Sequence, residues 1–282
     1  MQKVGILHPG QMGSSVAASA LKAGCQVYWA SEGRSPETHA RAARLDLRDA
    51  GSLAQLCATC AIVISVCPPH AAETVARQVA DCGFDGLYLD ANAIAPQQAV
   101  RIGQIVGQTG AAFVDGGIVG PPAWEPETTW LYLSGPEAQT VARCFEAGPL
   151  ETAILGEAPG QASALKMCYA AWTKGSTALL AAIVAAAEAM SVWPALRQQW
   201  ERNWPGFAGQ TEGRVRRVTA KAWRFAGEME EIAATLEEAG LPGGFHGAAA
   251  DLYRRIAHFK GAPQVPPLEE VLDALRRDDP AE

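Results

Sequence analysis

The chain has 282 residues, of which 49% are hydrophobic and 19% charged, with a formal net charge of −7. This length predicts about two domains of roughly 150 residues each, and this composition is typical of a globular protein with a hydrophobic core. The net negative charge argues against nucleic acid as a partner, because no broad basic surface is available to neutralise phosphates.

The N-terminal segment MQKVGILHPG shows no charged leader followed by an apolar run, so we expect no secretory signal. The longest apolar stretch, 178–187, is shorter than the roughly 20 residues that cross a bilayer. The seven cysteines are scattered and odd in number, which favours free thiols. Cys57 and Cys60 form a CxxC, but no second ligand pair follows at zinc spacing. We therefore expect a cytoplasmic protein with no membrane partner and no metal site.

Up to about residue 155, short β-rich runs alternate with helical patterns. The predicted helices include Ser14–Ala23, Pro36–Ala43 and Pro96–Val106, and a proline suits the first turn of the last two. The predicted strands are Lys3–Leu7, Gln26–Ala30, Ala61–Cys67, Leu87–Leu89, Ala112–Val114 and Thr129–Ser134. This alternation predicts an α/β fold with a doubly wound sheet and right-handed crossovers, a Rossmann domain over residues 1–156.

Residues 157–282 are predicted to form an all-α domain, because strand patterns stop there. One Ala-rich helix is predicted over 160–190 and another over 247–259, with loops at Trp193-Pro194 and Trp204-Pro205. Between them, apolar residues repeat at steps of three and four and form one helical stripe: Val215, Val218, Ala222, Phe225, Met229, Ile232 and Leu236. Such a stripe is either part of the domain core or the seam of a dimer.

The segment VGILHPGQMGSSVAASALKAG has the order strand, tight turn, helix. A dinucleotide-binding turn needs glycines so that the backbone approaches the pyrophosphate at the helix N-terminus. Gly10 and Gly13 occupy two of the three glycine positions, with Gln11 and Met12 between them, whereas His8 stands at the first position. We predict that residues 10–13 bind a dinucleotide, the alternative being an ordinary βα turn with His8 as a turn residue.

The end of the second predicted strand bears on the choice between NAD(H) and NADP(H). NAD enzymes carry an acidic residue there for the ribose diol, and Ser31 takes that position in this chain. Arg34 and Ser35 follow, and a guanidinium with hydroxyl groups suits a 2′-phosphate. We predict NADP(H) as the cofactor, while Glu32 keeps NAD(H) open.

Five motifs in this order resemble the β-hydroxyacid dehydrogenase superfamily, which includes 3-hydroxyisobutyrate and 6-phosphogluconate dehydrogenases and imine reductases: LHPGQMG, ISVCPPH, LDANAIAP, VDGGIVGPP and GQASALKMCYA. The resemblance covers residues 1–260 and is closest to a phosphogluconate dehydrogenase-like branch with a short helical C-terminal domain. It implies hydride transfer between NADP(H) and a small organic carbonyl or alcohol, in a homodimer.

The resemblance also implies roles for single residues. Val66, Cys67 and Pro68 match the loop along the cofactor, and Asn92 matches the residue near the nicotinamide ribose, with an Asx turn as the alternative. Lys166 matches the catalytic lysine. An ammonium beside the cofactor crevice can donate a proton to the substrate oxygen as hydride reaches carbon. A lysine in the apolar run ALKMCYAAW is otherwise a snorkelling helix residue.

The chain departs from the family at the substrate loop, which is predicted to comprise Gly117, Ile118, Val119 and Gly120. The relatives' Ser-Gly-Gly, which grips a carboxylate, is Val119-Gly120-Pro121 here, and proline has no N–H to donate. This departure favours a less charged, more apolar carbonyl or imine as the substrate.

Ala170 replaces the relatives' asparagine, so we predict that Tyr169 acts as a catalytic hydrogen-bonding group and that Thr173 contacts substrate on the same helix face. Packing alone is the alternative for Tyr169. His246 is a further candidate for substrate binding, with helix capping or solvent exposure as its alternative.

The basic residues Arg214, Arg216 and Arg217 are predicted to lie on a solvated helix face. Two other functions stay open: an imine reductase, and a sensor that binds NADP(H) without turnover.

Overall fold

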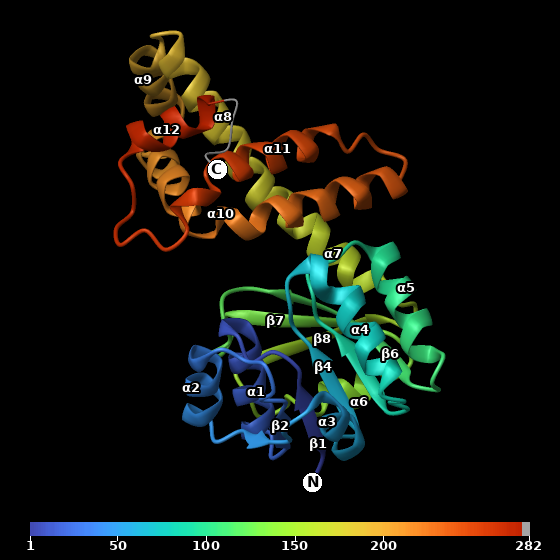
Figure 1. Cartoon of the computed structure of the whole chain (residues 1–282). Helices are drawn as coiled ribbons and strands as arrows, with labels where there is room; N and C mark the ends of the chain where they lie inside the picture. Colours follow the sequence, from blue (N-terminus) through green and yellow to red (C-terminus); the bar gives the residue numbers. More distant parts are fainter. Residues whose placement is uncertain (278–282) are drawn as a thin grey trace. The chain divides into compact units, whose positions relative to one another are not determined.

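The computed structural model describes residues 1–277, which form two compact units divided between Met167 and Cys168 (Figure 1). The predicted boundary lay earlier, at 156/157. The difference arises because the first turns of the helix α7 (Gln161–Ala170) pack on the sheet of the first unit. Residues 278–282, the end of the predicted second domain, lie outside the described residues.

The first unit contains an eight-stranded sheet with the order β3-β2-β1-β4-β5-β6-β7-β8. All neighbouring strands are parallel except β6 and β7. The strands are β1 (Lys3–Ile6), β2 (Gln26–Trp29), β3 (Arg48–Asp49), β4 (Ile62–Ser65), β5 (Leu87–Asp90), β6 (Ala112–Val119), β7 (Thr129–Ser134) and β8 (Leu150–Gly156). The predicted doubly wound α/β fold is confirmed.

Helices cover both faces of this sheet (Figure 1). Besides α7 and the 3-10 turn Pro69–Ala71, they are α1 (Gln11–Lys22), α2 (Pro36–Arg44), α3 (Leu53–Thr59), α4 (Ala72–Asp81), α5 (Pro96–Gly107) and α6 (Ala138–Ala142). Successive strand side chains point to opposite faces, so Ile62 and Ile64 join one hydrophobic cluster and Val63 the other. Burial on both faces explains why these strands are continuous apolar runs.

Two strands and part of a third were not predicted from the sequence. The strand β3 has only two residues, both exposed, and β8 is partly exposed. The strand β6 extends beyond Val114 through Asp115, Gly116 and Gly117, which are residue types with low strand propensity. Their buried pairing with β7 overrides that local preference.

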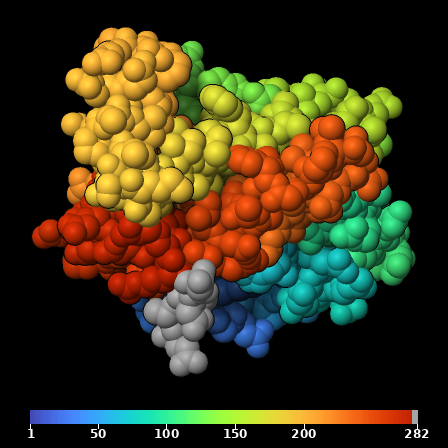
Figure 2. Space-filling model, turned by 90° about the horizontal axis from the view of Figure 1, so that it is seen from above, coloured from blue at the N-terminus to red at the C-terminus, as the bar shows by residue number. Residues whose placement is uncertain are grey.

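The second unit is all-helical, as predicted. It contains a π-helical turn (Ala171–Gly175), α8 (Ser176–Ala189), α9 (Trp193–Asn203), α10 (Phe207–Glu238), α11 (Gly244–Arg255), a 3-10 turn (Ala257–Phe259) and α12 (Leu268–Arg276). In Figure 2 the yellow residues of α8 lie against the orange and red residues of the later helices. Within the predicted stripe, Val215, Ala222, Met229 and Ile232 are buried inside this unit. These four members of the stripe therefore belong to the core of the unit.

Two predictions for the helical half are wrong. The predicted single helix over 160–190 is interrupted by the π-helical turn. The predicted loop at Trp193-Pro194 is instead the start of α9, where proline is tolerated because the first-turn N–H groups have no helical partner.

The helical run Gln161–Ala189 has 29 residues, and an 18-residue window within it has a mean hydropathy of 1.3, so the run is long and apolar enough to cross a membrane. The apolar stretch considered in the sequence, 178–187, is only part of this run. Length and composition are weak evidence, since the core helix of a soluble protein meets the same criteria. Here α8 packs against α10, α11 and α12.

The buried carboxylate of Asp115 on β6 holds the N-terminus of α7. It accepts four hydrogen bonds: from Ser134 Oγ at 3.0 Å, Gly160 N at 2.9 Å, Ser163 N at 3.0 Å and Ser163 Oγ at 2.6 Å. Ala162 N donates to Ser134 Oγ at 3.1 Å. The first N–H groups of a helix lack helical partners, and β6 and β7 supply them here.

Replacing Asp115 with asparagine (Asp115→Asn) should lower the free energy of unfolding by about 3 kcal/mol, because the amide NH₂ cannot accept the buried donors that it would face. Urea unfolding measures this change. The exposed Asp49, which accepts one hydrogen bond from Gly51 N, offers a matched control: Asp49→Asn should cost less than about 1 kcal/mol. Equal costs for the two variants would contradict this account of Asp115.

Candidate functional site

The candidate residues of the first unit gather at one edge of the sheet. The strands β1, β4, β5 and β6 are parallel, so their carboxyl ends lie at the same edge. The strand order reverses between β1 and β4, and ligands of open α/β sheets bind outside the carboxyl ends at such a point. The segments 10–13, 66–68 and 117–120 and the residue Asn92 all lie at these strand ends.

The turn between β1 and α1 is shaped for close approach of a phosphate. A Cβ atom on Gly13 would lie 2.1 Å from the carbonyl oxygen of His8, so only glycine fits there. A Cβ on Gly10 would meet nothing within 4 Å, which leaves the loop backbone open. The first turn of α1 holds no acidic residue. The helix N-terminus thus suits the pyrophosphate of a dinucleotide.

His8 occupies the position where the dinucleotide pattern has its first glycine. Its carbonyl oxygen accepts the N–H of Gly10 at 2.8 Å. Burial, assisted by the positive charge of Arg34, lowers the pKa of His8 to about 4. The imidazole is therefore neutral near pH 7, which agrees with the interpretation of His8 as a turn residue.

The segment after β2 contains the residues predicted to select the cofactor. Arg34 donates from its Nε to the carbonyl oxygen of Ala30 at 3.4 Å, and its backbone N–H donates to the carbonyl oxygen of Ser31 at 3.1 Å. Ser35 caps α2, since its hydroxyl accepts the N–H of Thr38 at 3.4 Å. Ser31 is partly exposed and Glu32 is exposed. Arg34 and Ser31 are thus adjacent, whereas the Ser35 hydroxyl already serves the helix.

Asn92 joins the loops that follow β4 and β5. Its Oδ1 accepts the N–H of Cys67 at 2.5 Å, and its Nδ2 donates to Ser65 Oγ at 3.1 Å and to Asp90 Oδ2 at 2.9 Å. The side chain is 2% exposed. Asp90 Oδ1 also accepts the N–H of Asn92, which is an Asx turn. Asn92 therefore shapes the loop at Val66, Cys67 and Pro68.

Lys166 lies where α7 rests on the carboxyl half of β6. A Cβ atom on Gly117 would be 2.5 Å from the carbonyl oxygen of Ala162 and 3.0 Å from the Cβ of Lys166, so glycine is required for this packing. The loop beyond turns back on β7: Gly120 has a φ of +132°, and Thr129 Oγ1 donates to the carbonyl oxygen of Pro121 at 2.6 Å. Ile118 is buried and Val119 is half-buried. Within one unit, the structure thus brings Lys166 to the strand edge that carries the turn of residues 10–13.

The remaining candidates belong to the second unit. Tyr169 is 49% exposed, so its phenol is accessible. Thr173 Oγ1 donates to the carbonyl oxygen of Tyr169 at 3.1 Å, and its hydroxyl is used within the helix. His246 is 7% exposed, and its Nε2 would lie 2.8 Å from a Cβ on Gly175. His246 thus lies in the first turn of α11 (Gly244–Arg255), where it is buried in the helical unit and not exposed to solvent.

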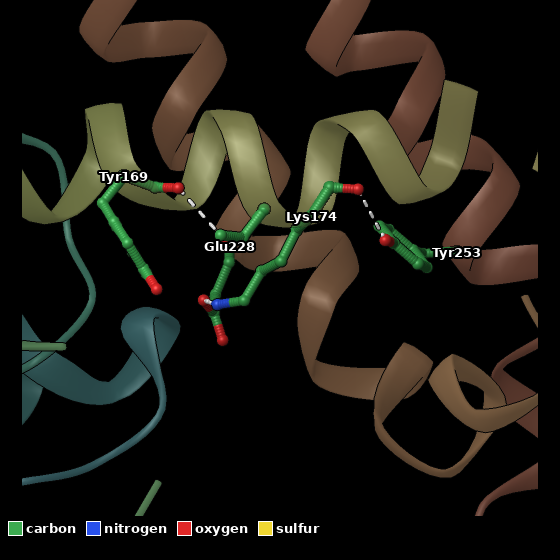
Figure 3. A network of polar contacts seen from close by, with 5 residues as sticks. Tyr169, Lys174, Glu228 and Tyr253 are labelled. Carbon is green, nitrogen blue, oxygen red and sulfur yellow. Dashed lines mark hydrogen bonds and ion pairs between the residues drawn. The ribbon is translucent and has the colours of Figure 1, made fainter. Parts of the chain in front are cut away.

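A buried ion pair in this unit was not predicted from the sequence. Lys174 pairs with Glu228, and their side chains are 17% and 10% exposed. The Lys174 ammonium also lies 4.6 Å from the centre of the Phe225 ring. Tyr253 donates to the carbonyl oxygen of Lys174 at 2.8 Å (Figure 3). The available signal was Glu228, a charged residue between Phe225 and Met229 of the apolar stripe.

The prediction that the basic residues Arg214, Arg216 and Arg217 form a solvated face is wrong for the first two. Arg214 donates to the carbonyl oxygen of Thr173 at 2.6 Å and to Ser176 Oγ at 2.7 Å, and thereby binds the π-helical turn. Arg216 donates to the carbonyl oxygen of Pro266 at 2.8 Å. Irregular backbone leaves carbonyl groups without helical partners, and these two guanidinium groups donate hydrogen bonds to them.

The Asp90 carboxyl group provides a pH test of this strand edge. Burial, opposed by hydrogen bonds from Asn92, raises the pKa of Asp90 from 3.8 to about 7. Between pH 4 and pH 7 the folded chain keeps a proton that the unfolded chain has lost, so the free energy of unfolding falls as pH rises. Asp90→Asn cannot titrate. The free energy of unfolding of Asp90→Asn minus that of wild type should therefore rise by about 1–3 kcal/mol between pH 5 and pH 8. A cost of the substitution that does not depend on pH leaves this rise unchanged. Parallel pH profiles in urea unfolding would refute this titration.

Comparison with known proteins supports the fold. The model of the NAD binding domain of 6-phosphogluconate dehydrogenase matches residues 3–146, and a domain of unknown function, DUF1932, matches residues 187–256. No curated protein matches the chain.

Solved structures similar to this chain are numerous. The protein MTH1747, described as similar to 3-hydroxyacid dehydrogenases, is 25% identical with a TM-score of 0.66, over 90% of this chain and 97% of its own. The Mycobacterium tuberculosis 3-hydroxyisobutyrate dehydrogenase is 18% identical (TM-score 0.70; 98% and 100% covered). A Streptomyces aurantiacus imine reductase is 19% identical (TM-score 0.53; 98% and 100% covered).

The dinucleotide-binding family covers just over half of the chain, and its fold is present. The chain therefore belongs to the family of the NAD binding domain of 6-phosphogluconate dehydrogenase, within the β-hydroxyacid dehydrogenase superfamily of nicotinamide-dinucleotide-dependent oxidoreductases.

Proposed function

We propose that the chain reduces a small organic carbonyl, or oxidises the corresponding alcohol, with NADP(H) as the cofactor and Lys166 as the acid and base. The observation that carries this proposal is the packing of Lys166 on Gly117, at the strand edge that also holds the Gly10–Gly13 turn. An amine there is on the side of the sheet where an open α/β fold binds its ligands.

In this mechanism the bound nicotinamide cofactor supplies or accepts a hydride at its ring. The N-terminus of α1 and the backbone of residues 10–13 hold the pyrophosphate. Lys166 donates a proton to the carbonyl oxygen as the substrate carbon is reduced, and in the reverse direction it takes the proton from the alcohol. Asp115 and Gly117 act through position, because they fix the first turns of α7 against β6.

Lys166→Ala should lower kcat by about 10²–10⁴-fold while NADPH binding is retained, because the variant loses a positioned proton donor but no contact to the phosphates. The measurement is NADPH consumption with a panel of ketones, hydroxy acids and a cyclic imine, together with NADPH titration by fluorescence. Lys22, exposed at the end of α1, provides the control variant Lys22→Ala with unchanged turnover. Turnover at the wild-type rate in Lys166→Ala would remove the lysine from the mechanism.

The cofactor preference rests on Arg34 and Ser31. A guanidinium bonded to a phosphate dianion contributes roughly 1.5–3 kcal/mol, or about 10- to 100-fold in affinity. Arg34→Gln should weaken NADPH binding by that factor and leave NADH binding within about threefold. The control is Arg48→Gln on β3, since Arg48 lies over the Tyr28 ring and is exposed. Equal loss of both cofactors in Arg34→Gln would show that Arg34 does not read the 2′-phosphate.

Imine reduction is the second candidate, and Pro121 favours it. Proline has no N–H for a substrate carboxylate, and its carbonyl oxygen is already bonded to Thr129. The cyclic imine in the substrate panel separates this activity from ketone and hydroxy acid chemistry. Tight NADPH binding with no consumption across the panel would favour an NADP(H)-binding sensor over both enzymes.

A further inference from the structure

A basic groove of about 380 Å³ lies in the first unit beside the N-terminus of α1. Its wall residues come from three separate parts of the chain: Gln11 and Ser14 on α1, Arg41 and Arg44 on α2, and Pro122 and Trp124 in the loop after β6. No motif in the sequence groups these six residues, and the proposed function uses only the backbone of one of them, Gln11. We refer to these six residues as the arginine groove.

The charge of the arginine groove is uncompensated. Its lining includes two arginines and no acidic residue, and α1 has no acidic residue in its first turn. Glu37, on the first turn of α2, is near Arg41 but does not line the groove. The positive end of the α1 dipole adds to the two guanidinium charges. An anion is the ligand that this field attracts.

The two arginines are held differently. Arg41 donates from Nε to the carbonyl oxygen of Pro9 at 3.0 Å and from Nη2 to Thr38 Oγ1 at 3.0 Å, which orients its guanidinium. Arg44 donates only from Nε, to the carbonyl oxygen of Ala40 at 3.3 Å. Among residues 1–277, the Nη atoms of Arg44 have no ion-pair or hydrogen-bond partner, so both are available to a ligand.

The opposite wall is apolar and fixed in place. Trp124 is 50% exposed, whereas its neighbour Ala123 is fully buried and anchors the loop. The loop is closed by the hydrogen bond from Trp124 N to the carbonyl oxygen of Pro122 at 2.9 Å and by that from Thr129 to Pro121. A half-exposed indole that lines the same groove as two guanidinium groups suits a flat apolar body that carries a negative charge.

A second groove, of about 540 Å³ in the helical unit, shows the contrast. Its lining includes Arg197 and Glu212, and these two residues form an ion pair at 3.0 Å. Its positive charge is therefore already neutralised within the chain. Arg41 and Arg44 also lie in the last turn of α2, where positive charge stabilises the helix through its dipole. This helix-stabilising role does not use the Nη donors of Arg44.

We propose that the arginine groove binds an organic anion, a carboxylate or phosphate attached to a flat apolar body, with the anion on Arg44 and Arg41 and the body against Trp124. The proposal concerns binding alone and does not require the chain to turn over a substrate. Phenyl phosphate serves as the probe, with benzyl alcohol as its uncharged counterpart.

Isothermal titration of the full chain with phenyl phosphate should give saturable binding, and benzyl alcohol should bind at least 10-fold more weakly. Arg44→Glu should weaken phenyl phosphate at least 10-fold, because reversal of an exposed charge repels the anion without disturbing a buried contact. Arg143→Glu, at the exposed end of α6, is the matched control and should bind as wild type does. Trp124→Ala should also weaken binding, and thermal melting checks that each variant is folded.

Competition identifies the source of the natural anion. Displacement of phenyl phosphate by NADPH but not by NADH would assign the groove to the cofactor 2′-phosphate, whereas binding that neither cofactor displaces would assign it to a separate metabolite. Both outcomes support the anion site. Equal binding of phenyl phosphate to wild type and Arg44→Glu would overturn it, as would equal binding of benzyl alcohol. The Lys166→Ala result stays independent of either outcome.

Discussion

The carboxylate of Asp115 is the contact on which the candidate chemistry depends. The first N–H groups of α7 are buried against the sheet, and each would cost free energy if left unpaired. Asp115 and Ser134 satisfy them from β6 and β7, and the negative charge lies at the positive end of the helix dipole. Burial raises the pKa of Asp115, and the four donated bonds oppose that effect. These bonds fix the rotation of α7 about its axis and its position along that axis, and they therefore fix the backbone position of Lys166.

Gly117 completes this constraint because it has no side chain. Its Cα lies under the carbonyl oxygen of Ala162 and beside the Cβ of Lys166, so a larger residue would push α7 off the strand. Asp115 and Gly117 thus form one packing unit with the segment that begins at Gly160, whose φ is +98°. The two motifs VDGG and GQASALK, far apart in the sequence, meet at this point.

The sequence predicted what repeats locally and missed what depends on distant contacts. Apolar runs identified β1, β4 and β5, and the stripe from Val215 to Leu236 identified a core helix, because periodicity reports burial directly. The glycine turn was recognised at Gly10 and Gly13 because a pyrophosphate would need to approach its backbone, and the structure adds that a Cβ on Gly13 would clash with the carbonyl oxygen of His8. The role of Asp115 was not predicted, since its partners are up to 48 residues away in the sequence. The π-helical turn was missed for the same reason: Arg214 and Tyr253, from other helices, bind its carbonyl groups.

Each unit contains a buried polar cluster that fixes the local arrangement of the chain more than it adds to stability. The cluster of Asn92, Asp90 and Ser65 joins two strand ends, and the Lys174–Glu228 pair lies beside the π-helical turn. A buried ion pair gains little over an apolar replacement, because desolvation cancels most of its attraction, whereas loss of one partner leaves a buried charge. Such clusters therefore penalise alternative arrangements more than they stabilise the native one. Both stand beside candidate site residues, Cys67 in the first unit and Thr173 in the second.

The carbonyl group of Pro9 connects the arginine groove with the turn of residues 10–13. It accepts from Arg41 Nε at 3.0 Å and from Ser14 Oγ at 3.1 Å, and it precedes Gly10. An anion that draws the guanidinium of Arg41 into the groove weakens its bond to Pro9, and the Pro9 carbonyl group then loses one of its two side-chain hydrogen bonds. Thermodynamic linkage requires that a dinucleotide on the loop shift the affinity of the groove by the same factor. Equal shifts in the two dissociation constants would establish this coupling, and independent constants would show that Ser14 alone holds the carbonyl in place.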